Sequence, residues 1–209
     1  MRHLLLLFVV HLFLATSGLA QLQFSGLEGR VGTLYSMPKQ SDVLANQKAI
    51  WGLQMAYSTT FTDSVNFPGW SVQPSLVFSR RGYNQEFDRT YSFRYMSSGL
   101  QLLVGRQIKP WLLLQFGGEV CGIDVNTAGT NSNVTYTEYG VYSGHEFALA
   151  GGFQLFNNRR ISFYSQYVYG LTPLLRYQKI DKLGNFTGNI RDVYSRAVQL
   201  GFQVKIIKP

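Results

Sequence analysis

Few residues in this chain could carry out chemistry, and the clearest grouping is Ser143, His145 and Glu146. A serine, a histidine and an acid can form a nucleophilic relay in which the histidine accepts the serine proton. On a β-strand, however, successive side chains point to opposite faces, so Glu146 would point away from the other two. We therefore expect no catalysis at this position and no enzyme, with a lipid A-modifying barrel enzyme as an alternative.

Metal and cofactor chemistry has equally little support. The only cysteine is Cys121, and the only histidine beyond the N-terminal segment is His145, so no paired ligand spacing exists. The glycine-rich stretch 26–32 is not followed by a helical pattern, which a phosphate-binding loop would require. We expect no metal, no cofactor, and a Cys121 that is a small buried side chain.

The N-terminus has the features of an export signal. A short basic start, Met1-Arg2-His3, precedes the apolar run 4–14, and small residues lead to Ala20. The apolar run is shorter than the roughly 20 residues that a membrane-spanning helix needs. We predict a signal peptide over 1–20, cleavage between Ala20 and Gln21, and one β-barrel domain over 21–209.

The composition favours an unusual β protein. Charged residues make up only 14% of the chain, whereas soluble domains contain about 25%. Aromatic residues reach 15%, and the formal net charge is +8. A basic chain can bind nucleic acid, but export and the lack of a basic recognition motif argue against such a partner.

The hydrophobic pattern has a period of two along most of the chain. In the segment 196–206, Leu200 and Phe202 lie on one face, and Gln199 and Gln203 lie on the other. An apparent change of phase at 97–99 indicates a bulge. The pattern predicts eight strands, at 26–36, 48–61, 69–81, 90–106, 110–124, 143–156, 160–172 and 194–207.

The connections and strand faces favour a membrane barrel. Tight connections at 107–109 and 157–159 alternate with long ones at 127–140 and 173–193. Short periplasmic turns opposite long extracellular loops are typical of outer-membrane barrels. The polar faces carry Gly, Ala, Ser and Gln, whereas a soluble barrel would show charged residues to water. We expect an all-β transmembrane antiparallel up-and-down barrel, with a soluble periplasmic lipocalin-like binding barrel as an alternative.

Several stretches resemble the outer-membrane β-barrel family that includes the PorT-like proteins of Gram-negative bacteria. The residues that carry the likeness lie in four segments, 71–83, 95–103, 110–122 and 165–172, followed by 197–202. Ser75 departs from the glutamate common in the family, and the chain ends without a terminal aromatic residue. The resemblance implies an integral outer-membrane location and a role in the envelope or in secretion assembly, with no catalytic residues.

Two sets of charged residues form the candidate sites. The first set faces the predicted lumen, where its members could form a structural charge network: Glu28, Arg30, Glu119, Glu146 and Lys205. The second set lies in the predicted long loops, where basic side chains could bind anionic lipopolysaccharide: Arg80, Arg81, Arg89, Arg176, Lys179 and Lys182.

We expect a non-catalytic structural, surface-binding or secretion-assembly protein whose partners are outer-membrane lipid, lipopolysaccharide and possible envelope or secretion-complex proteins. A narrow channel for small solutes or ions is a further alternative, although eight strands leave room for little besides side chains.

Overall fold

The computed structural model describes residues 22–37, 39–40, 46–63, 67–86, 90–124, 138–142, 144–180 and 186–207. The predicted signal peptide over 1–20 lies outside these residues. Ten strands are present in the described part of the chain: β1 (Gln23–Ser36), β2 (Lys39–Gln40), β3 (Asn46–Asp63), β4 (Trp70–Glu86), β5 (Thr90–Lys109), β6 (Leu112–Asp124), β7 (Glu138–Tyr142), β8 (His145–Leu155), β9 (Ile161–Ile180) and β10 (Phe186–Ile207).

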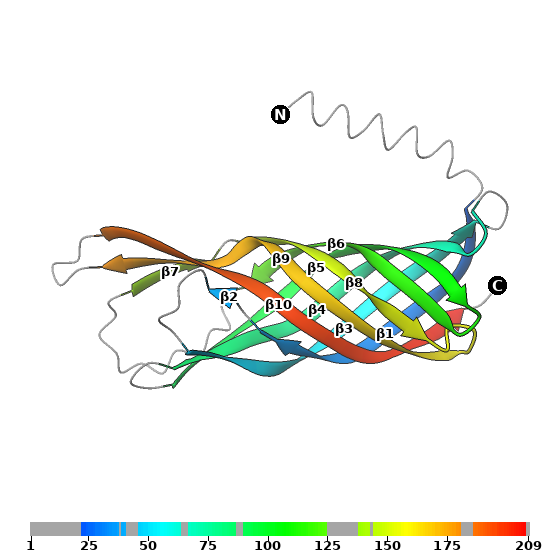
Figure 1. Ribbon diagram of the computed structural model, residues 1–209, viewed down its shortest axis with the longest axis horizontal. Helices are drawn as coiled ribbons and strands as arrows, with labels where there is room; N and C mark the ends of the chain where they lie inside the picture. The colour runs from blue at the N-terminus through cyan, green and yellow to red at the C-terminus, as the bar shows by residue number, and fades with distance from the viewer. Residues whose placement is uncertain are drawn as a thin grey trace, which may run out of the picture.

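Eight of these strands close into an up-and-down barrel (Figure 1). Each barrel strand pairs antiparallel with the next one along the chain, in the order β1-β3-β4-β5-β6-β8-β9-β10, and β10 returns to β1. The closing seam has a regular register in which Gly32 faces Gly201 and Arg30 faces Gln203. The predicted fold class and strand number are therefore confirmed. The two short strands extend the wall at one end: β2 continues β1 along β10, and β7 pairs with β9.

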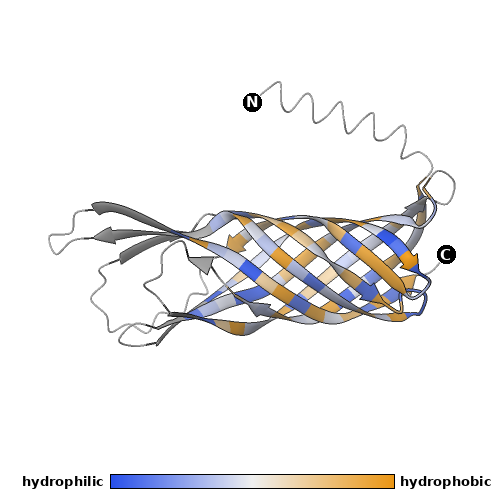
Figure 2. Ribbon diagram, in the orientation of Figure 1, coloured by the Kyte–Doolittle hydropathy of each residue, from blue (hydrophilic) through white to orange (hydrophobic). Residues whose placement is uncertain are grey.

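The barrel is polar inside and apolar outside. Hydrophobic and hydrophilic residues accordingly alternate along its strands (Figure 2). Trp51, Leu100 and Phe116 each expose more than 60% of their surface on the outer face. The buried polar side chains, by contrast, are mostly glutamine and serine, and they point into the lumen. Among the described residues, no helix is long and apolar enough to cross a membrane. A soluble barrel has the opposite polarity, because its outer face must be hydrated.

Inward-facing glycines let the narrow wall pack closely. A side chain at Gly99 would collide with the backbone of Val120 and Cys121, and one at Gly117 would collide with the backbone of Leu102. The predicted bulge at 97–99 is wrong, because pairing with both neighbouring strands is continuous there. The alternation looked broken because the inward position is a glycine and the outward Ser98 is polar.

Hydrogen bonds between neighbouring turns hold the short-turn end together. The Phe156 N–H donates to the Trp111 carbonyl over 2.6 Å, and the Gln107 N–H donates to the Gly69 carbonyl over 2.7 Å. The Asn157 side-chain amide donates to the Gln107 side-chain oxygen over 2.9 Å. Three successive turns are thus joined around this mouth of the barrel.

The opposite end extends well beyond the closed wall (Figure 1). The prediction of a loop over 173–193 is wrong, because β9 continues to Ile180 and β10 already begins at Phe186. These extensions pair with each other, and β7 adds to the free edge of β9 from Glu138 to Tyr142. The sequence suggested a loop here because the stretch 173–193 is rich in Asn, Gly and charged residues.

Candidate functional site

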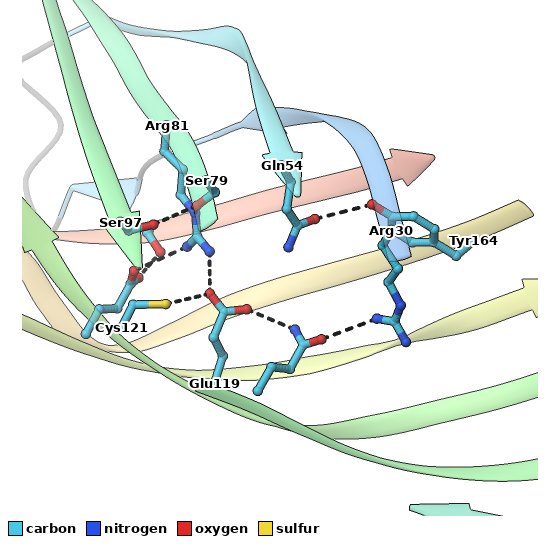
Figure 3. Close-up of polar contacts among 11 residues, drawn as sticks. Arg30, Gln54, Ser79, Arg81, Ser97, Glu119, Cys121 and Tyr164 are labelled. Atoms are coloured by element: carbon cyan, nitrogen blue, oxygen red, sulfur yellow. Dashed lines mark hydrogen bonds and ion pairs between the residues drawn. The ribbon is translucent and has the colours of Figure 1, made fainter. Parts of the chain in front are cut away.

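The lumen contains a polar network built around two buried arginines (Figure 3). We call it the lumen network and define it by eight side chains: Glu28, Arg30, Gln73, Arg81, Gln101, Glu119, Glu146 and Gln203. Every one of them is at most 5% exposed. They reach the lumen because each lies at an inward position of the strand alternation.

Arg81 on β4 is held by two carboxylates. Its guanidinium donates to Glu119 on β6 and, over 3.3 Å, to Glu146 on β8. Its Nε donates to the Ser79 hydroxyl over 2.8 Å. The Ser195 hydroxyl donates to the remaining oxygen of Glu146. A buried charge costs least when it is paired and hydrogen-bonded, and each of the three guanidinium nitrogens of Arg81 has a partner here.

Arg30 on β1 is held by amides instead. Its Nε donates to the Gln203 side-chain oxygen over 2.5 Å, and its Nη2 donates to the Gln73 side-chain oxygen. The guanidinium carbon also lies 5.5 Å from the centre of the Tyr164 ring, within the range of a cation–π contact. The amide groups of Gln73 and Gln203 both donate to Glu28. The two glutamines therefore bridge Arg30 and that carboxylate.

Gln101 joins the two clusters. Its amide group donates to Glu119 over 2.9 Å, and its oxygen accepts a long bond of 3.4 Å from Arg30. The contacts from Arg30 to Gln101 and from Arg81 to Glu146 link strands that are not neighbours in the wall, so they cross the lumen. The network thus fills the middle of the barrel with paired charge.

A polar cavity, which we call the vestibule, lies between the network and the short-turn end of the barrel. This cavity has a volume of about 460 Å³, and Glu28, Gln73, Gln115 and Lys205 are among its lining residues. The Lys205 Nζ donates to the Asn157 backbone carbonyl over 2.5 Å. Together with Arg30 and Arg81, Lys205 brings three positive charges to the lumen, which balance the three carboxylates of the network.

The structure places the predicted lumen residues on the inner side of the wall. Glu28, Arg30, Glu119 and Glu146 are buried, whereas Lys205 is half-buried at the edge of the vestibule. Glu28 accepts hydrogen bonds from Gln73 and Gln203, so it belongs to the Arg30 half of the network. The expected set therefore divides into two clusters.

The prediction that Arg81 lies in a lipopolysaccharide-binding loop is wrong. Strand β4 continues to Glu86, and Arg81 is only 1% exposed inside the barrel. Two signals in the sequence could have revealed this position. Arg81 lies two residues beyond the inward Ser79, and the predicted interior carried more acidic than basic charge. The amides Gln73, Gln101 and Gln203 were also missed, because a glutamine on a polar face shows no sign of its partner.

The other predicted loop residues have varied positions. Arg80 is exposed on the outer face of β4, opposite Leu53 of β3 and two residues from Phe78, in the long-loop half of the barrel. Arg176 and Lys179 lie within the extended strand β9, where the structure describes their backbone pairing with β7. Arg89 and Lys182 lie outside the described residues.

Of the three residues of the relay considered from the sequence, the structure describes His145 and Glu146. His145 is exposed, whereas Glu146 is buried and bonded to Arg81 and Ser195. Ser143 lies outside the described residues. Cys121 is buried, and its thiol donates to Glu119 over 3.0 Å. Within the described ranges, no group of three or more potential ligands could hold a metal ion.

A closed eight-stranded meander with a polar lumen and an apolar belt defines a class of protein, the small transmembrane β-barrels. Comparison with solved structures agrees with this class. The chain resembles the outer membrane protein OprG from Pseudomonas aeruginosa, with a TM-score of 0.53, 13% identity and coverage of 89% of this chain and 98% of that one.

The chain also resembles Neisserial surface protein A, with a TM-score of 0.51, 12% identity and coverage of 88% of this chain and 99% of that one. These low identities show a shared fold and nothing finer. No family model matches the sequence, and no curated protein matches it either.

Proposed function

We propose that this protein is a non-catalytic integral barrel of the bacterial outer membrane whose function lies at its long-loop end. The observation that carries the proposal is the inverted polarity of the wall, with exposed leucine, phenylalanine and tryptophan outside and paired charges inside. Such a surface is stable only in hydrocarbon, where the closed sheet also leaves no unpaired edge.

The lumen network supports a role other than transport. Its side chains meet across the middle of the barrel, and each arginine is held by several partners. Passage of a solute would require several of these bonds to break together. A narrow channel is therefore the weaker candidate.

The extended ribbon supports a surface role. Strands β9 and β10 stay paired beyond the barrel, and β7 widens the ribbon to three strands (Figure 1). An ordered platform of this kind suits binding to a surface partner or to an envelope or secretion complex, and the resemblance to PorT-like proteins supports the second possibility. Arg80, exposed on the outer face of the long-loop half, suits contact with lipopolysaccharide phosphate.

Two measurements on the mature chain test the proposal. The chain is folded into phosphatidylcholine vesicles and run on a semi-native gel with and without boiling. A compact band that slows after boiling is expected, as is the absence of ion conductance in a planar bilayer. A chain that stays outside the vesicles and shows no heat shift would contradict the membrane barrel, and steady conductance would favour the channel.

A further inference from the structure

A cationic hollow lies on the barrel surface at the short-turn end. It has a volume of about 290 Å³, and its lining is Asn158, Arg159 and Arg160 from the β8–β9 turn with Lys205 and Ile206 from β10. Three of these five residues are cationic, and none of the described residues that line the hollow is acidic. A small anion would therefore meet the favourable charge of Arg159 and Arg160 at the turn, whereas the Lys205 side chain also lines the vestibule and donates to the Asn157 carbonyl.

The backbone holds this hollow in shape. Phe156 adopts a positive φ of 59°, which is unusual for an aromatic residue and turns the chain sharply into the β8–β9 connection. The Arg159 N–H donates to the Phe156 carbonyl, and the Lys205 N–H donates to the Arg160 carbonyl, each over 2.9 Å. The Lys205 Nζ then reaches back to the Asn157 carbonyl. These bonds fix the backbone at Arg159, Arg160 and Lys205 before any ligand binds.

An apolar surface continues from the hollow along the barrel wall. Ile161, Ile206 and Ile207 expose between 50% and 58% of their surface, and Phe156 exposes 50%. Strands β9 and β10 are paired here, with Ile161 facing Val204 in the register. Cationic side chains at the end of an apolar strip match the chemistry of an anionic lipid, which has a phosphate headgroup attached to acyl chains.

We propose that this hollow binds the phosphate headgroup of an anionic phospholipid in the periplasmic leaflet, with an acyl chain along Ile161 and Ile206. The inference rests on the proposed function, because short turns face the periplasm in outer-membrane barrels. Arginine suits the site, since its planar fork donates two parallel bonds to a phosphate. Lipopolysaccharide is not the expected ligand because it occupies the other leaflet. A zwitterionic headgroup suits the hollow less well because it would bring its own cation into it.

The test uses the mature chain folded into phosphatidylcholine vesicles that carry a trace of spin-labelled lipid. The immobilised fraction of spin-labelled phosphatidylglycerol is compared with that of spin-labelled phosphatidylcholine. Wild-type protein should retain the anionic label preferentially. The pair Arg159→Gln and Arg160→Gln should lower this preference by about fivefold for each charge removed, as expected for basic residues at an anionic surface. High salt should also weaken the preference.

A matched control removes the same charge from the same end of the barrel. Arg106→Gln with Lys109→Gln changes two exposed residues of β5 that do not line the hollow. This pair should leave most of the preference intact. The proposal would be overturned if the two double variants lost the preference for the anionic label equally, or if the wild-type protein showed no such preference.

Displacement of the label by millimolar inorganic phosphate would also overturn it, because the site would then take free phosphate. The heat-shift assay is run on the same samples. A chain that inserts but shows no lipid preference refutes this inference alone, whereas a chain that does not insert refutes the proposed function as well.

Discussion

The two buried arginines of the lumen occupy different environments although both lie in the same barrel. Arg81 contacts two carboxylates directly, whereas Arg30 contacts amides and an aromatic ring and reaches Glu28 only through Gln73 and Gln203. Loss of Arg81 leaves two carboxylates without the cation between them, while loss of Arg30 leaves the oxygens of two neutral amides without that donor. The cost of removing a buried charge therefore depends on what it leaves behind.

The largest effect should come from Arg81→Met. The change strands Glu119 and Glu146 in the lumen and should lower the free energy of unfolding by about 3–5 kcal/mol. Urea unfolding of the vesicle-embedded chain, followed by tryptophan fluorescence, measures the loss. As a control, adding Glu119→Gln and Glu146→Gln to the same variant should restore most of the stability. An unchanged unfolding midpoint for Arg81→Met would refute the comparison.

Arg30→Met should cost less, about 2 kcal/mol, because it removes charge-assisted hydrogen bonds without leaving bare carboxylates in contact. The same urea titration provides the measurement. Arg80→Met is the matched control, since Arg80 faces outward and its loss should have little effect on the free energy of unfolding. If Arg30→Met proved more damaging than Arg81→Met, Glu28 would be the dominant charge of the lumen and our ranking of the clusters would be wrong.

Gln101→Leu should cost about 1 kcal/mol by removing the link between the clusters. A sharper readout is the coupling between Arg30→Met and Glu119→Gln in a double-mutant cycle. Coupling of about 0.5 kcal/mol or more is expected with Gln101 present, and close to zero with leucine in its place. Coupling that persists without Gln101 would show that the clusters interact directly through space.

The smallest effect should come from Cys121→Ser, at roughly 1 kcal/mol or less, because the hydroxyl can still donate to Glu119. In the wild type, a maleimide should react with the buried thiol of Cys121 only after unfolding. Rapid labelling of the intact barrel would place Cys121 at an accessible surface. It would then contradict the burial of the thiol beside Glu119 in the Arg81 cluster.

The sequence predicted the barrel far better than the contacts within it. Alternation at period two marks each inward side chain, so Glu28, Arg30 and Glu119 could be placed from the sequence pattern alone. Which inward side chains contact one another depends on how the strands are staggered around the closed barrel. No local sequence pattern encodes that stagger. Arg81 was misplaced because a pair of arginines resembles a loop, although the strand continues beneath it to Glu86. The paired extensions of β9 and β10 were likewise predicted as a loop.

The lumen network also bears on how the barrel assembles. Its members include Arg30 on β1, the first barrel strand, and Gln203 on β10, the last, and these two residues meet only when the two strands pair. An unclosed sheet in hydrocarbon would expose both the bare strand edges and the unpartnered charges of its inner face. Closure should therefore be nearly all-or-none, so that half-built barrels remain outside the bilayer until the first and last strands meet.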